Sequence, residues 1–320
     1  MFKVYLIARN SFEEMVRQPL YVVIFYVMGL LITLSPLYTL FVFYETHRLL
    51  LEMGMTTIML TGIMTVSFSA SHTLTSEIHK KTILVLATKP VNRFQLLLGK
   101  YLGIVFCGFI MVLFHYILLV YVIRMGAIET SAFKIDWPVL VSLLFIFFGS
   151  NFYGFFQNYF SNKNFCSSAV YATIFFSLLS FFIIGIWDKE WHLSGYWMRF
   201  NPEFLKGVVL IFCSLLVISS ISLSLSPFVS RNANLFITFC LFAVGLFSDQ
   251  LVLSGSGEGT IFGLFLNVIP NFHVFQMSDA IIFDRIIPMS YMYSGVTYAL
   301  MYLVGVFTIG YVFFDRKELA

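Results

Sequence analysis

The sequence predicts an all-α polytopic membrane protein with about eight transmembrane helices and an N-terminal amphipathic surface helix. Hydrophobic residues make up 59% of the chain and charged residues only 11%, whereas soluble domains carry roughly 25% charged residues. Windows without charge recur along the chain, each close to the roughly 20 residues that cross a bilayer. The formal net charge of +3 is too small to indicate binding to nucleic acid.

Residues 1–18 predict an amphipathic helix that lies on the membrane surface. Apolar side chains fall on one helical face at spacings of three and four: Tyr5, Ala8, Phe12, Met15 and Val16. Polar and charged side chains share another face: Lys3, Asn10, Glu14 and Arg17. Pro19 then starts a new direction, because proline is tolerated at the first turn of a helix but not in its interior.

The remaining residues, 19–320, form the predicted transmembrane domain. Its eight predicted spans cover residues 19–44, 53–75, 101–123, 137–160, 165–187, 207–229, 232–252 and 288–314. The sixth and seventh spans are separated only by Arg231 and its neighbours, which predicts a tight turn. Residues 259–270 are also apolar, but twelve residues are too few to cross a bilayer and predict a re-entrant or interfacial piece.

The distribution of charge predicts the orientation of the spans. Twelve Lys and Arg fall on the side that carries both termini and seven on the other side, whereas the acidic residues divide into five and eleven. Because cations are enriched in cytoplasmic loops, we expect both termini in the cytoplasm of a multi-pass protein of the cell membrane, here a bacterial inner membrane. The four tryptophans lie at or beyond the predicted outer boundary, where indoles favour headgroup depth.

One polar interval, residues 76–100, lies between two membrane-length apolar runs and carries five cations. They are Lys80, Lys81, Lys89, Arg93 and Lys100. Residues 78–88 place apolar side chains at helical spacing, and Pro90 ends that helix. Asn92 begins a second helix with Gln95 in the capping-box position. From the pattern alone, a docking device for a cytoplasmic partner and an ordinary basic loop that fixes topology are equally open.

The same interval resembles the segment between the second and third spans of ABC-2 type permeases, the membrane subunits of one class of ABC transporter. The resemblance rests on Glu77, Thr82, Leu86, Lys89, Pro90, Val91, Arg93, Leu98, Gly99 and Lys100. Residues 2–18, 267–291 and 314–319 also resemble the surface helix, the segment before the last span and the charged ending of that family. Lys81 departs from the family pattern, in which a Gly often precedes the Thr. The family usually has six spans, so residues 137–187 look like an extra hairpin.

The resemblance implies a permease subunit, with export as the expected direction, that is energised by a separate ATPase. The interval 76–100 then contains a cytoplasmic coupling helix seated on that ATPase. The expected docking residues are Glu77, Lys80, Lys81, Thr82, Lys89, Pro90 and Arg93, with Glu13, Glu14 and Arg17 of the surface helix as a second contact.

The partners expected from this resemblance are an ABC ATPase subunit, a second permease copy and the lipid bilayer, without nucleic acid. No GxxxxGK[ST] occurs in the chain, so ATP and Mg are expected on the partner ATPase. We expect this chain to bind no cofactor or metal of its own and to carry no catalytic residue, so it is not expected to be an enzyme.

Two other function classes stay open. An ion-coupled secondary transporter generally carries acidic or basic groups at mid-membrane, and no acidic residue lies in the central part of any predicted span. His115 and Asn151 are the possible residues of a transport pathway. A neutral His115 bonded across a helix interface is the simpler interpretation. An integral membrane enzyme acting on lipid-linked substrates needs His, Asp or Glu converging at one interface, and the sequence shows no recognisable constellation of this kind.

Overall fold

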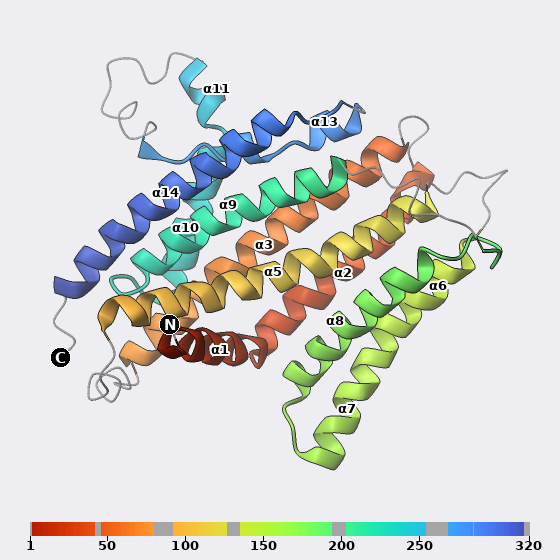
Figure 1. The fold of residues 1–320 in the computed structure, drawn as a ribbon, viewed down its shortest axis with the longest axis horizontal. Coiled ribbons are helices and arrows are strands. Elements are labelled where there is room, and N and C mark those ends of the chain that lie inside the picture. Colours follow the sequence, from red (N-terminus) through yellow and green to blue (C-terminus); the bar gives the residue numbers. More distant parts are fainter. Residues whose placement is uncertain are drawn as a thin grey trace.

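The structure of the protein is a computed structural model that describes most of the chain. The described residues are 2–41, 46–79, 92–126, 135–193, 203–253, 268–283 and 285–316. Within these ranges the secondary structure is helical, apart from an isolated bridge between Trp187 and Leu193. The predicted all-α class is therefore confirmed for the described part of the chain, and Figure 1 shows the long helices gathered into one bundle.

In the described residues, seven helices are long and apolar enough to cross a membrane, which gives a multi-pass membrane architecture. They are α2 (Pro19–Tyr38), α3 (Thr46–His79), α5 (Arg93–Met125), the continuous run of α6 (Trp137–Leu144), η2 (Phe145–Gly149) and α7 (Ser150–Ser161), α8 (Phe165–Ile184), α9 (Glu203–Leu225) and α14 (Met289–Arg316). Each overlaps one predicted span. A short 3-10 turn, η1 (Thr39–Phe41), continues α2.

The predicted seventh span is interrupted in the structure. Helix α10 (Arg231–Leu246) has 16 residues, and α11 (Ser248–Leu253) follows after a break. At 1.5 Å per residue, α10 rises about 24 Å, less than the roughly 30 Å of a hydrocarbon core. Its end packs against the segment that follows α11, because a Cβ at Gly245 would lie 2.5 Å from the carbonyl oxygen of Pro270. A complete eighth crossing stays a prediction.

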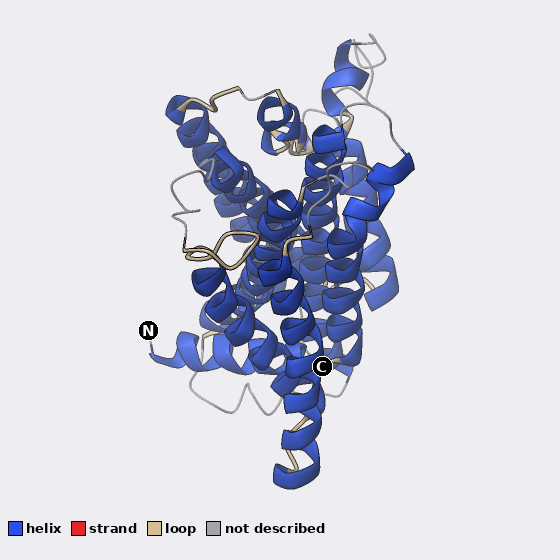
Figure 2. Ribbon diagram, turned by 90° about the vertical axis from the view of Figure 1, so that its right-hand side faces the viewer, coloured by secondary structure: helices blue, strands red, loops and turns tan. Residues whose placement is uncertain are grey.

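Helix α1 (Phe2–Val16) forms where the surface helix is predicted. Figure 2 shows it running across the direction of the bundle helices, at the end near which both termini lie. We call this end of the bundle the α1 end and the opposite end the far end. Met15 and Val16 are buried, whereas Tyr5, predicted on the same face, is 61% exposed. The C-terminal half of the expected apolar face is therefore buried, whereas Tyr5 near its start is exposed.

Helix α1 approaches α5 closely at two glycines one helical turn apart. A Cβ at Gly99 would lie 2.7 Å from Cβ of Ile7, and a Cβ at Gly103 would lie 2.7 Å from the carbonyl oxygen of Ala8. Small residues spaced by four let helix backbones approach in membrane proteins. The pair Gly99 and Gly103 therefore positions α1 against the start of the third predicted span.

The segment from α6 to α8 forms a hairpin on one flank of the bundle (Figure 1), where the sequence predicts an extra hairpin. Hydroxyl groups join it to the neighbouring helices. The hydroxyls of Tyr26 and Thr173 lie 2.6 Å apart, and those of Tyr121 and Ser180 lie 2.7 Å apart. Five residues of this run, Phe145–Gly149, form a π-helical turn between α6 and α7.

At the far end, the chain before α14 covers the ends of the bundle helices with η4 (His273–Phe275) and α13 (Ser278–Ile282). Phe272 and Phe275 are completely buried there. Glu203 of α9 accepts a hydrogen bond from the backbone N–H of Ile287 at 2.8 Å, and Lys206 donates to the Ile287 carbonyl at 3.0 Å. Most of the predicted re-entrant piece 259–270 lies outside the described residues.

Candidate functional site

The predicted coupling interval, residues 76–100, includes the end of one helix and the start of the next, both at the α1 end. α3 continues to His79, beyond the predicted end of the second span at residue 75, and α5 begins at Arg93. Glu77 lies in the last turn of α3. The other predicted docking residues of the interval, except Arg93, lie outside the described residues: Lys80, Lys81, Thr82, Lys89 and Pro90.

Arg93 contacts the last helix of the chain itself. Its Nη1 donates to the carbonyl oxygens of Phe314 at 3.2 Å and Asp315 at 2.7 Å, and its Nε lies 3.9 Å from an Asp315 carboxylate oxygen. A cation at this position donates hydrogen bonds to carbonyls at the C-terminal end of α14 and interacts favourably with the helix dipole. Arg93 therefore links the start of α5 to the end of α14.

The start of α5 agrees with the sequence prediction in position but not in its capping bond. Asn92 occupies the N-cap position with extended backbone angles, as predicted. Its side chain makes no capping hydrogen bond, so the predicted capping box is wrong. The hydrogen bonds from Arg93 to α14 stabilise this end of α5 instead.

The residues expected to form a second docking contact divide between two environments. Glu13 is partly exposed on α1 and accepts hydrogen bonds from Arg9 at 2.9 Å and Arg17 at 3.3 Å. Its hydrogen bond raises the pKa of the Arg9 guanidinium above the ordinary value, so Arg9 stays charged. Glu14 instead approaches α3, where its Oε1 lies 3.9 Å from Nδ1 of His72.

Lys100 is the main surprise at the α1 end, because the sequence predicts it as a loop cation. It lies inside α5 with an exposed fraction of 1%, and its Nζ donates to the carbonyl oxygen of Thr73 in α3 at 3.1 Å. A buried ammonium is costly unless it is well satisfied. A buried lysine at this position is therefore unusual. Its hydrogen bond joins α3 and α5, the two helices on either side of the predicted coupling interval.

A polar seam extends from this point across three helices. Asn234 of α10 donates to Oγ of Ser71 in α3 at 3.1 Å and to the carbonyl oxygen of Ser222 in α9 at 3.0 Å. Ser71 in turn donates to the carbonyl oxygen of Ser67 at 2.7 Å. Ser71 of α3 therefore does more than allow close packing, because its hydroxyl accepts a directional bond from another helix.

The predicted pathway residues His115 and Asn151 are not brought together. His115 is completely buried in α5, and its Nδ1 bonds the carbonyl oxygen of Met111 at 2.7 Å on its own helix. The expected bond across a helix interface is therefore wrong. Asn151 lies in α7 just after the π-helical turn and donates to the carbonyl oxygen of Phe147 at 2.7 Å.

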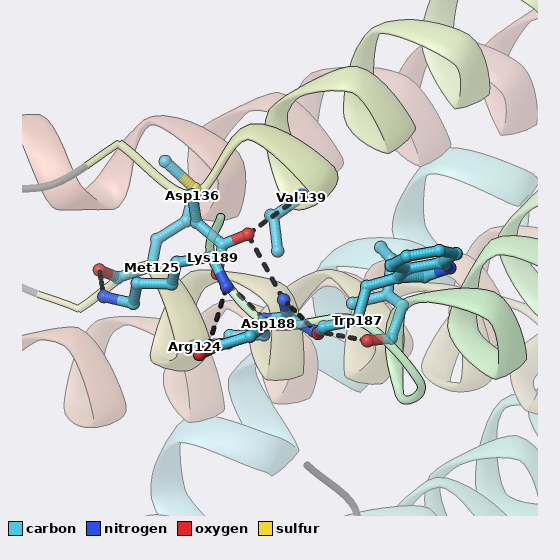
Figure 3. Close-up of polar contacts among 8 residues, drawn as sticks. Arg124, Met125, Asp136, Val139, Trp187, Asp188 and Lys189 are labelled. Carbon is cyan, nitrogen blue, oxygen red and sulfur yellow. Dashed lines mark hydrogen bonds and ion pairs between the residues drawn. The ribbon is translucent and has the colours of Figure 1, made fainter. Parts of the chain in front are cut away.

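A buried ion pair at the far end was missed from the sequence (Figure 3). Nε of Arg124 donates to Oδ2 of Asp136 at 2.8 Å, with side-chain exposed fractions of 3% and 0%. The guanidinium also donates to the carbonyl oxygens of Ile184 at 2.5 Å and Trp187 at 2.8 Å. Asp136 accepts from the backbone N–H of Val139 at 3.2 Å. One arginine thus fixes the ends of α5, α6 and α8.

An apolar cavity of about 930 Å³ lies between α1 and α5 at the α1 end. Its lining includes Tyr5, Phe12, Phe94, Leu98 and Phe106. The surface offers hydrocarbon contact rather than acid–base or metal chemistry. In the described ranges, no group of three or more His, Cys, Asp or Glu is arranged to hold a metal ion.

No protein-family model and no curated protein matches this chain. The features of the described residues that bear most on function are the contacts at the α1 end. These contacts place a buried cation, a close helix crossing and a polar seam directly next to the basic interval 76–100.

Proposed function

We propose that this chain is the membrane-spanning permease subunit of an ABC-2 type transporter, an exporter energised by a separate ATPase. The observation that supports this most is the hydrogen bond from Lys100 to Thr73, which ties α3 to α5 beside the basic interval. A partner that presses on residues 78–88 would act on both helices together. The mechanism needs no nucleotide site on this chain.

The contacts at the α1 end give a route for such a force. The close approach at Gly99 and Gly103 seats α1 on α5, Arg93 connects α5 to the end of α14, and Asn234 connects α3 to α9 and α10. Packed helices and hydrogen-bond networks of this kind can carry energetic coupling between distant parts of a protein. The proposal includes a second permease copy, identical or related, across from this one.

An ion-coupled secondary transporter is the second candidate, and His115 is the observation that favours it. Nε2 of His115 is completely buried and has no hydrogen-bond partner in the described part of the chain. Ionisable side chains inside a membrane are often functional. The remaining buried charges described above, Lys100, Arg124 and Asp136, lie toward the two ends of the bundle, which favours the permease.

The docking prediction is tested by reversing charge in the interval. The double change Lys80→Glu and Lys81→Glu, and separately deletion of residues 78–88, should reduce co-purification of an ATPase with the tagged chain at least tenfold. Pull-down in detergent followed by mass spectrometry for a protein with a Walker A motif measures this. Arg231→Glu is the matched control, because Arg231 is an exposed cation at the start of α10. Unchanged co-purification in the deletion variant would contradict the docking role.

The predicted orientation is tested by labelling single cysteines with a membrane-impermeant maleimide. In a background with Cys107, Cys166, Cys213 and Cys240 replaced by Ala, Lys81→Cys should react only after permeabilisation. Leu193→Cys, which replaces a 76% exposed far-end residue, should react in intact cells. Labelling of position 81 in intact cells would place the interval outside and exclude an ATPase partner there.

A further inference from the structure

A groove between α7 and α8 changes character along its length. At the α1 end it opens into a polar cavity of about 570 Å³, whose lining includes Arg17, Lys163, Asn164 and Ser167. Tyr153 and Tyr171 line this cavity and also line an apolar cavity of about 310 Å³. The two cavities are therefore neighbouring parts of one groove, which we call the α7–α8 groove.

The polar part of the groove carries two cations from separate elements. Lys163 lies in the turn between α7 and α8, where its backbone N–H donates to the carbonyl oxygen of Gln157 at 3.2 Å and its carbonyl accepts from Asn158 at 2.8 Å. No acidic side chain in the described part of the chain pairs with the Lys163 ammonium. Arg17 has one exposed pair, to Glu13 at 3.3 Å, and exposed pairs of this kind contribute little to stability.

The apolar part of the groove follows α8 away from the α1 end. Ala172, Phe175 and Phe176 line it beyond the two tyrosines. Phe175 is 62% exposed and Tyr171 is 47% exposed, so the groove is open along its side rather than closed like a core cavity. In a membrane, this open side faces hydrocarbon chains.

We propose that the α7–α8 groove binds an anionic glycerophospholipid of the leaflet at the α1 end. The phosphate lies against Arg17 and Lys163, and one acyl chain lies along Phe175 and Phe176. A ligand for this site needs negative charge at one end and hydrocarbon at the other, with the charged end at the level of α1. The N-terminal end of α8 adds a favourable potential for an anion.

This assignment gives Arg17 a lipid partner instead of the ATPase contact expected from the sequence. It rests on the membrane architecture and on the two joined cavities, not on the proposed transport function. A structural lipid at this place would attach the α6–α8 hairpin to α1, because Arg17 follows α1 whereas Lys163 lies at the tip of the hairpin.

The experiment is a lipid titration of the purified full-length chain, followed by native mass spectrometry. Phosphatidylglycerol should bind, and phosphatidylcholine with the same acyl chains should bind at least tenfold more weakly. The double variant Arg17→Gln and Lys163→Gln should lose at least tenfold in affinity for phosphatidylglycerol, because it removes both charged hydrogen bonds to the phosphate. Added salt should weaken the wild-type binding.

Four controls test this interpretation. Arg17→Lys with Lys163→Arg should keep the affinity, and Arg231→Gln, outside the groove, should leave it unchanged. Ala172→Phe should weaken binding by filling the apolar part, and soluble glycerol phosphate should not displace the lipid at equal concentration. An equal loss in Arg231→Gln, unchanged binding in Ala172→Phe, or full displacement by glycerol phosphate would overturn the proposal.

Discussion

Replacing Arg124 with Met is expected to lower the free energy of unfolding by about 3–5 kcal/mol, the usual cost of removing one partner from a buried ion pair. The carboxylate of Asp136 is completely buried, and without the guanidinium its charge has no compensation. The carbonyl oxygens of Ile184 and Trp187 lose their donor as well. Unfolding of the purified protein in mixed micelles, followed by circular dichroism during titration with a denaturing detergent, measures the loss.

A double variant separates the cost of the charge from the cost of the carbonyls. Arg124→Met with Asp136→Ser removes both charges and keeps a side chain that can cap α6, since Ser is a favourable N-cap residue. We expect this variant to recover more than half of the loss. If the double variant is as unstable as Arg124→Met alone, the unsatisfied carbonyls dominate and the ion-pair explanation is wrong.

Replacing Gly103 with Leu is expected to displace α1 from the bundle. The first added atom would lie 2.7 Å from a backbone oxygen of Ala8 and 2.8 Å from Cβ of Ser11, and a backbone cannot move aside as a flexible side chain can. Overpacking costs about 1–3 kcal/mol in general, and we expect the upper part of this range. Limited trypsin digestion measures the displacement as faster cleavage after Arg9 and Arg17.

Gly305→Leu is the matched control for this change. It introduces the same side chain into another long helix, α14, at a position where an added Cβ meets nothing within 4 Å. Its trypsin digestion should match that of the unaltered protein. Equal acceleration in both variants would show that Leu acts through general destabilisation rather than through the contact between α1 and α5.

The spans could be predicted from the sequence because the thickness of the bilayer fixes the length of each apolar run. The start of α5 at Asn92 was also predictable from local residue types. The interruption of the seventh span was not, because it depends on packing of Gly245 against Phe272 and Pro270, which follow more than twenty residues later.

The polar residues at the two ends were harder to place. The burial of Lys100 has a signal in the sequence, since helical phase puts it on the same face as Leu97, Tyr101 and Ile104, all buried in the structure. Gly99 belongs to the family resemblance, but its contact with α1 requires the position of a second helix. The pairing of Arg124 with Asp136 likewise depends on how two helices meet in space, which local periodicity does not specify.

Asn234 gives α10 an anchor that does not depend on lipid. Its amide fixes the rotation and the depth of a short helix relative to α3 and α9, whereas an isolated helix of this length would have to thin the bilayer around it. A thicker or thinner membrane should therefore leave α10 in place. The α6–α8 hairpin, which lies on the flank of the bundle, would absorb the mismatch by tilting.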